Sequence, residues 1–450
     1  MISQKKNRIY LNGSDCIMLA FDYQMRRLGA PGNMGQIILG LSSRFSETDF
    51  RNQISLVKKR FPIINAVLKR GLFNRIPYWE VDADSGLPYP QVKTHDLEKS
   101  TGPATLKALK RDILNQPMNI KKGELVRFDL IYTAGGCMKV IMTWAHVLMD
   151  AHGAESFLAI VGGSLMGKTD FNPTNNLMSG GYKNRFFDPP SSPPKWQDAK
   201  KFFNRIDNIA SAPPVSLYTK YKQKIKPRLD YQIISFDLDE TKYLLDLAEK
   251  NCGFLNESEY FISSVMGEFH NVCCAKGLDS PSYVVPLSVD LRKKGTRLPV
   301  FSNQFATLLY SFKPENLLCR ESIIEAFKIQ TQDAFRNNLI FANLCALEFS
   351  RFLPSWLYAR KVRQTLKGEI ASIVIANPGK SLSDLSTFMG IPVSYQHHVP
   401  TVVIPPGIGV VFYTYSGKLF ITLAYLEGMI SPVEADEFLQ KIRSHLLHRD

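Results

Sequence analysis

The sequence predicts a mixed α/β protein of two domains, and three observations support this. The chain has 450 residues, which is more than one ordinary hydrophobic core organises. Hydrophobic residues make up 45% and charged residues 21%, a composition typical of globular proteins. Strand-like and helix-like patterns alternate on both sides of a proline-rich, basic segment. We therefore expect an N-terminal domain at 1–170, a linker at 171–228 and a C-terminal domain at 229–450.

The first half alternates between strand and helix patterns. Short apolar runs predict strands, and apolar residues recurring every three or four positions predict helices. A capping signature at Ser46 and Asp49 opens one helix, and Phe61-Pro62 ends it. In chain order the expected elements are a strand at 36–41, a helix at 46–61, an extended segment at 65–69, a helix at 104–115, strands at 125–133 and 137–145, and a helix at 153–160.

The second half shows the same alternation. Its last part predicts a hairpin turning at Ser416-Gly417-Lys418, because two apolar runs flank residues typical of tight turns. The expected strands are 231–238, 283–287, 304–312 and 372–376, with the hairpin at 408–425, and the expected helices are 240–251, 258–273, 321–338, 341–359 and 432–447.

The net charge of +14 at pH 7 favours anionic partners. Coenzyme phosphates, an acidic carrier protein and a membrane surface all fit this charge. Nucleic acid is not expected, because no nucleic-acid-binding motif is present. The basic runs Lys220–Arg228 and Arg292–Arg297 are the expected docking positions. A solvated linker is the alternative interpretation of the first run.

Cysteine usage and the distribution of apolar residues predict a cytoplasmic protein. The seven cysteines form no CxxC motif, which is typical of reduced thiols. The basic start lacks the apolar region of a signal peptide, and no apolar run reaches the roughly 18 residues of a membrane span. Peripheral membrane contact is left open. His397-His398 has no acidic or cysteine neighbours, so we expect a loop pair and no metal site.

His146 is the candidate catalytic residue. Asp150 follows it four residues later, on the predicted connection between a buried strand and a helix. Catalytic groups concentrate in loops held by a rigid scaffold. An imidazole, with an ordinary pKa of about 6.5, can take a proton from an alcohol or amine that attacks a thioester. For the His-Asp spacing alone, a core histidine satisfied by backbone groups is the alternative.

Ordered segments along the chain resemble the coenzyme-A-dependent acyltransferase superfamily. That group includes chloramphenicol acetyltransferase, nonribosomal peptide condensation domains and the wax ester synthase / diacylglycerol acyltransferase group. The central likeness is residues 125–157, with strand, turn, strand and His-x-x-x-Asp. The other similar segments are 116–127, 285–292 followed by 302–305, and 375–379.

The resemblance implies two chloramphenicol-acetyltransferase-like domains with an active-site tunnel between them. His146 would be the general base at the centre of this tunnel. Asp150 would point away from substrate and form an ion pair with Arg292. Trp144 and Gly153 would belong to the active-site loop.

The resemblance also implies the co-substrates. Acyl-CoA, or the phosphopantetheine thioester of an acidic carrier protein, would supply the acyl group. A small molecule or lipid with a hydroxyl or amine would accept it, and no cofactor or metal would be permanently bound. Asn303 would belong to the motif of the second domain.

Two departures from the family's pattern concern the active-site loop. Ala145 stands where many relatives have a first histidine, and Ala151-His152 separates Asp150 from Gly153. Our first hypothesis is a thioester-dependent acyltransferase acting on a hydroxyl or amine. The alternative, which the altered loop favours, is a catalytically inactive condensation-like module that binds a carrier protein or ligand.

Overall fold

The computed structural model describes residues 7–71, 76–82, 86–88, 90–98, 102–163, 193–222, 227–253, 257–278, 281–293, 296–380 and 385–448. Most of the first half of the predicted linker, residues 223–226 of the first basic run, and Lys294 lie outside the described residues.

The strands and helices have the following bounds. The strands are β1 (Asn7–Tyr10), β2 (Met34–Leu41), β3 (Val67–Arg70), β4 (Pro77–Val81), β5 (Gln91–Leu97), β6 (Val126–Thr133), β7 (Met138–Ala145), β8 (Leu229–Ser235), β9 (Tyr283–Asp290), β10 (Phe305–Phe312), β11 (Val374–Lys380), β12 (Thr387–Phe388), β13 (Ile391–Val399), β14 (Ile408–Tyr415) and β15 (Lys418–Leu426). The helices are α1 (Gly13–Arg27), α2 (Glu47–Arg60), α3 (Pro103–Leu114), α4 (Ala151–Val161), α5 (Pro193–Ile209), α6 (Leu217–Tyr221), α7 (Leu238–Cys252), α8 (Glu257–Ala275), α9 (Arg320–Arg336), α10 (Leu339–Ser350), α11 (Ser355–Thr365) and α12 (Pro432–Leu447).

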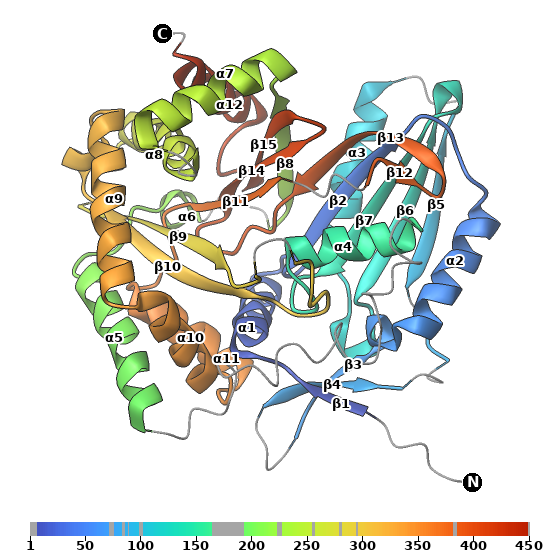
Figure 1. Ribbon diagram of the computed structural model, residues 1–450, viewed down its shortest axis with the longest axis horizontal. Helices are drawn as coiled ribbons and strands as arrows, with labels where there is room; N and C mark the ends of the chain where they lie inside the picture. The colour runs from blue at the N-terminus through green and yellow to red at the C-terminus, as the bar shows by residue number, and fades with distance from the viewer. Residues whose placement is uncertain are drawn as a thin grey trace.

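The N-terminal lobe is a sheet covered by helices on both faces (Figure 1). Among the described residues its strands run in the order β12-β13-β2-β7-β6-β5. Helices α2 and α4 share a core with Leu39 and Met142 on one face, while α3 packs near Ile38 and Ile141 on the other. Burial on both faces explains why β7 is apolar almost throughout and could be recognised from its sequence.

Strand β13 joins the two lobes although it comes late in the chain. It pairs antiparallel with β2, placing His397 opposite Ile38 and His398 opposite Ile37, and the chain then returns to the C-terminal lobe at β14. The expectation that His397-His398 lies in a loop is wrong, because both residues are part of this strand. Their side chains therefore point to opposite faces of the sheet. The domain bounds drawn from the sequence stay a prediction.

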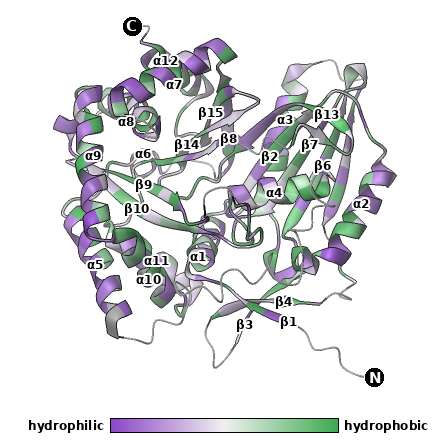
Figure 2. Cartoon of the chain, viewed as in Figure 1, coloured by the Kyte–Doolittle hydropathy of each residue, from purple (hydrophilic) through white to green (hydrophobic). Residues whose placement is uncertain are grey.

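The C-terminal lobe surrounds smaller sheets with helices (Figure 1). Among the described residues these sheets have the orders β11-β14-β15-β8 and β10-β9. The β14–β15 hairpin turns at Ser416-Gly417, both with positive φ. Figure 2 shows hydrophobic residues gathered on the inner strands and hydrophilic residues along outer helices such as α2 and α5. The mixed α/β fold class predicted from the sequence is confirmed.

Two helical regions were not predicted. Helix α1 begins at a capping box formed by Asn12 and Asp15 and packs against α10 and α11. Helices α5 and α6 fall within the predicted linker 171–228, where Phe202 and Ile206 of α5 are buried in the core. No helix in the described part of the chain is long and apolar enough to cross a membrane.

Candidate active site

His146 lies in the tight connection between β7 and α4. Its backbone N–H donates to the carbonyl of Asn33 at 2.9 Å, and Leu148 N–H donates to Ala145 O at 2.9 Å. The buried indole of Trp144 donates to Met149 O at 3.0 Å. The loop therefore has its backbone fixed from both ends, which suits a residue whose ring must be held in one orientation.

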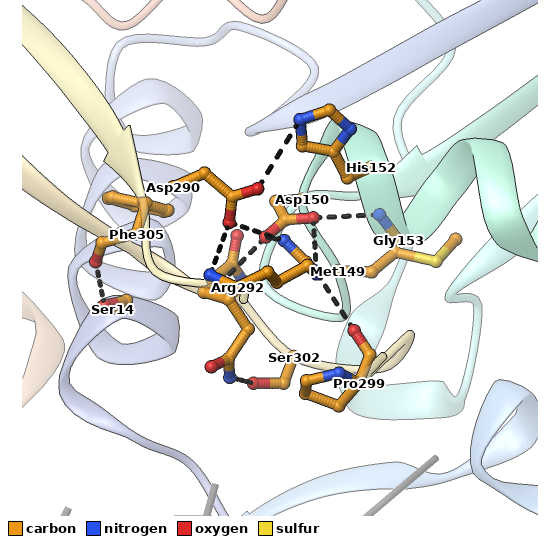
Figure 3. Close-up of polar contacts among 12 residues, drawn as sticks. Ser14, Met149, Asp150, His152, Gly153, Asp290, Arg292, Pro299, Ser302 and Phe305 are labelled. Carbon is orange, nitrogen blue, oxygen red and sulfur yellow. Dashed lines mark hydrogen bonds and ion pairs between the residues drawn. The ribbon is translucent and has the colours of Figure 1, made fainter. Parts of the chain in front are cut away.

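Asp150 caps helix α4 and binds residues from the opposite lobe (Figure 3). Its carboxylate accepts from the Gly153 N–H and from the Gln304 N–H, each at 2.9 Å. Arg292 contacts both carboxylate oxygens, Nη1 to Oδ2 and Nη2 to Oδ1, at 2.9 Å each. Arg292 also donates to Pro299 O at 3.0 Å, and its side chain is only 3% exposed. This bidentate ion pair joins α4 to the loop after β9.

The environment of Asp150 stabilises its ionised form. Burial alone would raise the pKa of Asp150, but the charge of Arg292 and the N–H groups of Gln304 and Gly153 outweigh it and lower the pKa. Burial would likewise lower the pKa of Arg292, yet the charge of Asp150 raises it. Both groups are therefore charged over the ordinary pH range.

Gly153 allows α4 to approach the C-terminal lobe closely. A Cβ at this position would lie 2.3 Å from the backbone oxygen of Val300, a distance that real side chains do not adopt. The loop–helix junction thus requires the smallest residue, even though Ala151-His152 separates it from Asp150.

His152 points towards Asp290, with Nε2 at 3.7 Å from a carboxylate oxygen (Figure 3).

Asn303 orients the ring of His146. The Asn303 side-chain N–H₂ donates to Asp15 Oδ1 and to His146 O, both at 2.9 Å, so its Oδ1 faces Nδ1 of His146 at 3.1 Å. An amide oxygen accepts hydrogen bonds only, so Nδ1 carries the proton and donates. The lone pair of the neutral ring is consequently on Nε2, which forms no hydrogen bond to any described residue.

Asp15 in turn holds Asn303. Its Oδ1 also accepts from the Asn303 backbone N–H at 2.8 Å. Burial raises the pKa of Asp15 to about 7, against the opposing effect of the hydrogen bonds from Asn303 and Asn12. Asn12 adds a bond from Nδ2 to Asn303 O at 3.1 Å. The sequence carried a signal for the cap at Asn12 and Asp15, but none for this contact across the lobes.

Burial lowers the pKa of the His146 imidazole, although hydrogen bonds to its own carbonyl and to Asn303 and the charge of Asp150 act in the opposite direction. The ring is therefore neutral at neutral pH. A neutral, half-buried imidazole with one nitrogen fixed as a donor can act as a general base at the other.

The chain is similar to known proteins in its structure. No family model and no curated protein matches the sequence. The starter condensation domain of rhizomide synthetase RzmA, in complex with C8-CoA and Leu-SNAC, matches with a TM-score of 0.67 at 14% identity, over 98% of this chain and 94% of that chain. The first condensation domain of the calcium-dependent antibiotic synthetase gives 0.70 at 13% identity, over 98% and 96%. This chain has the condensation-domain fold. TRI3 trichothecene 15-O-acetyltransferase from Fusarium sporotrichioides matches it too, with a TM-score of 0.69 at 12% identity, over 98% and 95%.

Within this condensation-domain fold, the predicted site residues meet where the lobes join. His146, Asp150 and Gly153 come from the N-terminal lobe, and Arg292 and Asn303 from the C-terminal lobe. Trp144 supports the loop through the hydrogen bond from its indole to Met149 O. The resemblance to acyltransferases of this superfamily holds for the fold.

The described part of the chain has hollows away from His146. One of about 400 Å³ lies at the end of α4, lined by Gln53, Gly162, Gly163, Thr387, Met389 and Gly390. It does not border His146, so the tunnel stays a prediction. In the part of the chain that the structure describes, no three His, Cys, Asp or Glu side chains gather as metal ligands.

Proposed function

We propose that the protein transfers an acyl group from a coenzyme A or carrier-protein thioester to a hydroxyl or amine, with His146 as the general base. The carrying observation is the hydrogen bond from His146 Nδ1 to Asn303 Oδ1, which leaves Nε2 as the basic nitrogen. The fold supports the proposal, because solved structures that share it include an O-acetyltransferase and a condensation domain in complex with an acyl-CoA.

The reaction is a direct transfer. His146 Nε2 takes the proton as the acceptor oxygen or nitrogen attacks the thioester carbonyl carbon, forming the new C–O or C–N bond and a tetrahedral oxyanion. Collapse of the oxyanion breaks the C–S bond, and the thiolate leaves with the proton from Nε2. Asp150 and Arg292 do not exchange protons in these steps, because both hold their charges in the ion pair.

His146→Ala tests the proposal. Thiol release is measured with short, medium and long acyl-CoA and a panel of alcohols and amines. General-base catalysis contributes roughly a hundred- to ten-thousand-fold, so turnover should fall by that factor while the melting temperature changes little. His152→Ala is the matched control, because this neighbouring histidine points towards Asp290, and it should stay active.

Two results would contradict the proposal. A purified His146→Ala protein that retains more than about a tenth of wild-type turnover excludes His146 as the base. Binding of acyl-CoA without thiol release from any acceptor would indicate the binding or scaffold module instead.

A further inference from the structure

Cationic and aromatic side chains gather on the face of the N-terminal sheet opposite α4. They come from elements that meet at the junction of the lobes, with α3 behind β13 and beside β8 in Figure 1. We call this group the seam cluster. Its members are Lys110 on α3, Lys139 on β7, Tyr231 on β8, and Tyr395 and His397 on β13.

The seam cluster contains two sets of contacts. Lys139 Nζ donates to the Tyr395 hydroxyl at 2.8 Å, and Tyr395 stacks on His397 with ring centroids 4.6 Å apart. Lys110 Nζ lies 6.0 Å from the centroid of the Tyr231 ring. The Tyr395 ring lies directly over Gly40, where a Cβ would come within 2.2 Å of it. A glycine in the middle of β2 therefore makes room for this ring.

The lysines of the seam cluster have no carboxylate partner within the described residues. No ion pair joins Lys110 or Lys139 to an acidic side chain there, and the nearby Asp230 accepts from the Tyr231 backbone N–H at 2.8 Å. Burial, and then the charges of Lys139 and Lys107, lower the pKa of Lys110. Burial, and then the charges of Lys110, His398 and Lys139, lower the pKa of His397 to about 4. The positive charges of the lysines thus repel one another at a site that is partly shielded from water.

The Tyr231 hydroxyl is a second, independent observation. The residue is only 9% exposed, and its hydroxyl has no hydrogen-bond partner among the described residues. The Tyr395 and Tyr413 phenols lie near enough to influence it. Leaving a buried hydroxyl unpaired is unfavourable, so this hydroxyl is available to a polar partner that the chain itself does not supply.

We propose that the seam cluster binds a phosphate or phosphate ester, held by Lys110, Lys139 and the Tyr231 hydroxyl. Lys139 uses one of its three ammonium protons on Tyr395 and keeps two, while Lys110 has all three for a ligand. Several donors from different elements suit an anion that offers three acceptor oxygens better than a carboxylate with two.

The seam cluster is separate from His146. Lys139 and His146 lie seven positions apart on β7 and its extension, which is about 23 Å along a strand. Phosphate binding there can therefore be measured without catalysis, and it stands whether or not the protein transfers acyl groups.

The test measures binding by calorimetry and by the shift in melting temperature, at constant ionic strength. The probes are inorganic phosphate, acetate, coenzyme A, and pantetheine, which carries no phosphate. Lys110→Met or Lys139→Met should weaken phosphate binding about tenfold or more, the loss expected for one charge-assisted hydrogen bond. Lys110→Arg should restore most of it. Lys93→Met, at a half-buried lysine on β5 of the same sheet, is the control.

Tyr231→Phe should affect the melting temperature of the free protein and the increase caused by phosphate differently. Removing a buried, unpartnered hydroxyl should leave the melting temperature of the free protein unchanged or raised, while the increase caused by phosphate becomes smaller. A merely structural tyrosine would not separate these two effects.

The binding measurements test whether the seam cluster binds phosphate, and they distinguish a phosphate ester from free phosphate. Tighter binding of coenzyme A than of phosphate, lost in Lys110→Met, would support a phosphate ester, and binding of inorganic phosphate alone would support free phosphate. Phosphate binding no better than acetate, or equal weakening in Lys93→Met, would overturn the proposal. His146→Ala should bind phosphate normally, so failure of the acyl-transfer proposal would be seen separately.

Discussion

Two groups of charged side chains lie where the lobes meet, and they differ in whether the chain supplies the counter-charge. Asp150 accepts from Gly153 and Gln304 and pairs with Arg292, so its hydrogen-bonding capacity is filled by the protein. Lys110 and Lys139 face each other's charge with no carboxylate bonded to either among the described residues. The satisfied pair fixes geometry, whereas the unsatisfied cluster indicates a ligand.

The largest effect should come from breaking the satisfied pair. Asp150→Ala or Arg292→Ala leaves one buried charge unpaired and should reduce the free energy of unfolding by about 3–5 kcal/mol. His146→Ala removes a half-buried ring and should cost much less. Urea unfolding of the three variants measures this difference.

A double variant sharpens the interpretation. Asp150→Ala/Arg292→Ala should be less destabilised than the sum of the single variants, because no unpaired charge remains. Additive losses would show that the two side chains are not energetically coupled, and equal midpoints for all three single variants would show that neither charge is left buried and unpaired.

Gly153→Ala tests the contact on the other side of the same loop. The added methyl group would meet Val300 O at 2.3 Å and should destabilise the protein by about 1–3 kcal/mol, as overpacking does. Gly267→Ala is the control, since a Cβ in helix α8 would meet only Ile323 Cδ1 at 3.8 Å. This control should be neutral or stabilising by up to about 1 kcal/mol. Similar unfolding midpoints for both variants would argue against the close contact.

The sequence was informative where local pattern decides structure. The apolar run of β7 and the spacing of α4 placed His146 on a strand–helix connection. The pairing of Asp150 with Arg292, 142 positions later, came from the family resemblance, because local pattern does not specify which distant residues meet. The role of Asp15 was missed for the same reason.

Strand β13 shows a different limit. Its sequence, IPVSYQHHV, carries polar side chains on both faces, which is unusual for a strand inside a sheet. These polar groups find partners only after folding, since His398 contacts Glu155 of α4 at 2.9 Å and His397 contacts the Tyr413 hydroxyl at 3.2 Å. Pattern alone therefore favoured a loop.

Asp15 allows a pH test of the site. Its pKa rises from an ordinary 3.8 to about 7 on folding, so the folded state retains a proton that the unfolded state loses as the pH rises from about 4 to about 7. The wild-type free energy of unfolding should therefore fall, relative to Asp15→Asn, by about 1 kcal/mol between pH 6 and pH 7. Denaturant titrations at both pH values measure this. Parallel profiles for the two proteins would place the ionisation elsewhere.

The smallest expected effect concerns capture of the acyl donor by exposed charge. The structure removes Arg292 from the basic positions that could do this, because its side chain is committed to Asp150. Of those basic positions, Lys222 and Lys293 are exposed among the described residues. Each exposed attraction contributes about 0.2–1 kcal/mol, so the Michaelis constant for acyl-CoA should rise about two- to fivefold from low to high salt, with little change in turnover. A plain acyl thioester without phosphates should show no such rise, and Lys293→Met should flatten the dependence for acyl-CoA. Steady-state kinetics with both donors over a salt series measures this.

If the two donors respond identically, the net charge of +14 does not serve donor capture, and an anionic membrane surface becomes the partner to test with vesicles.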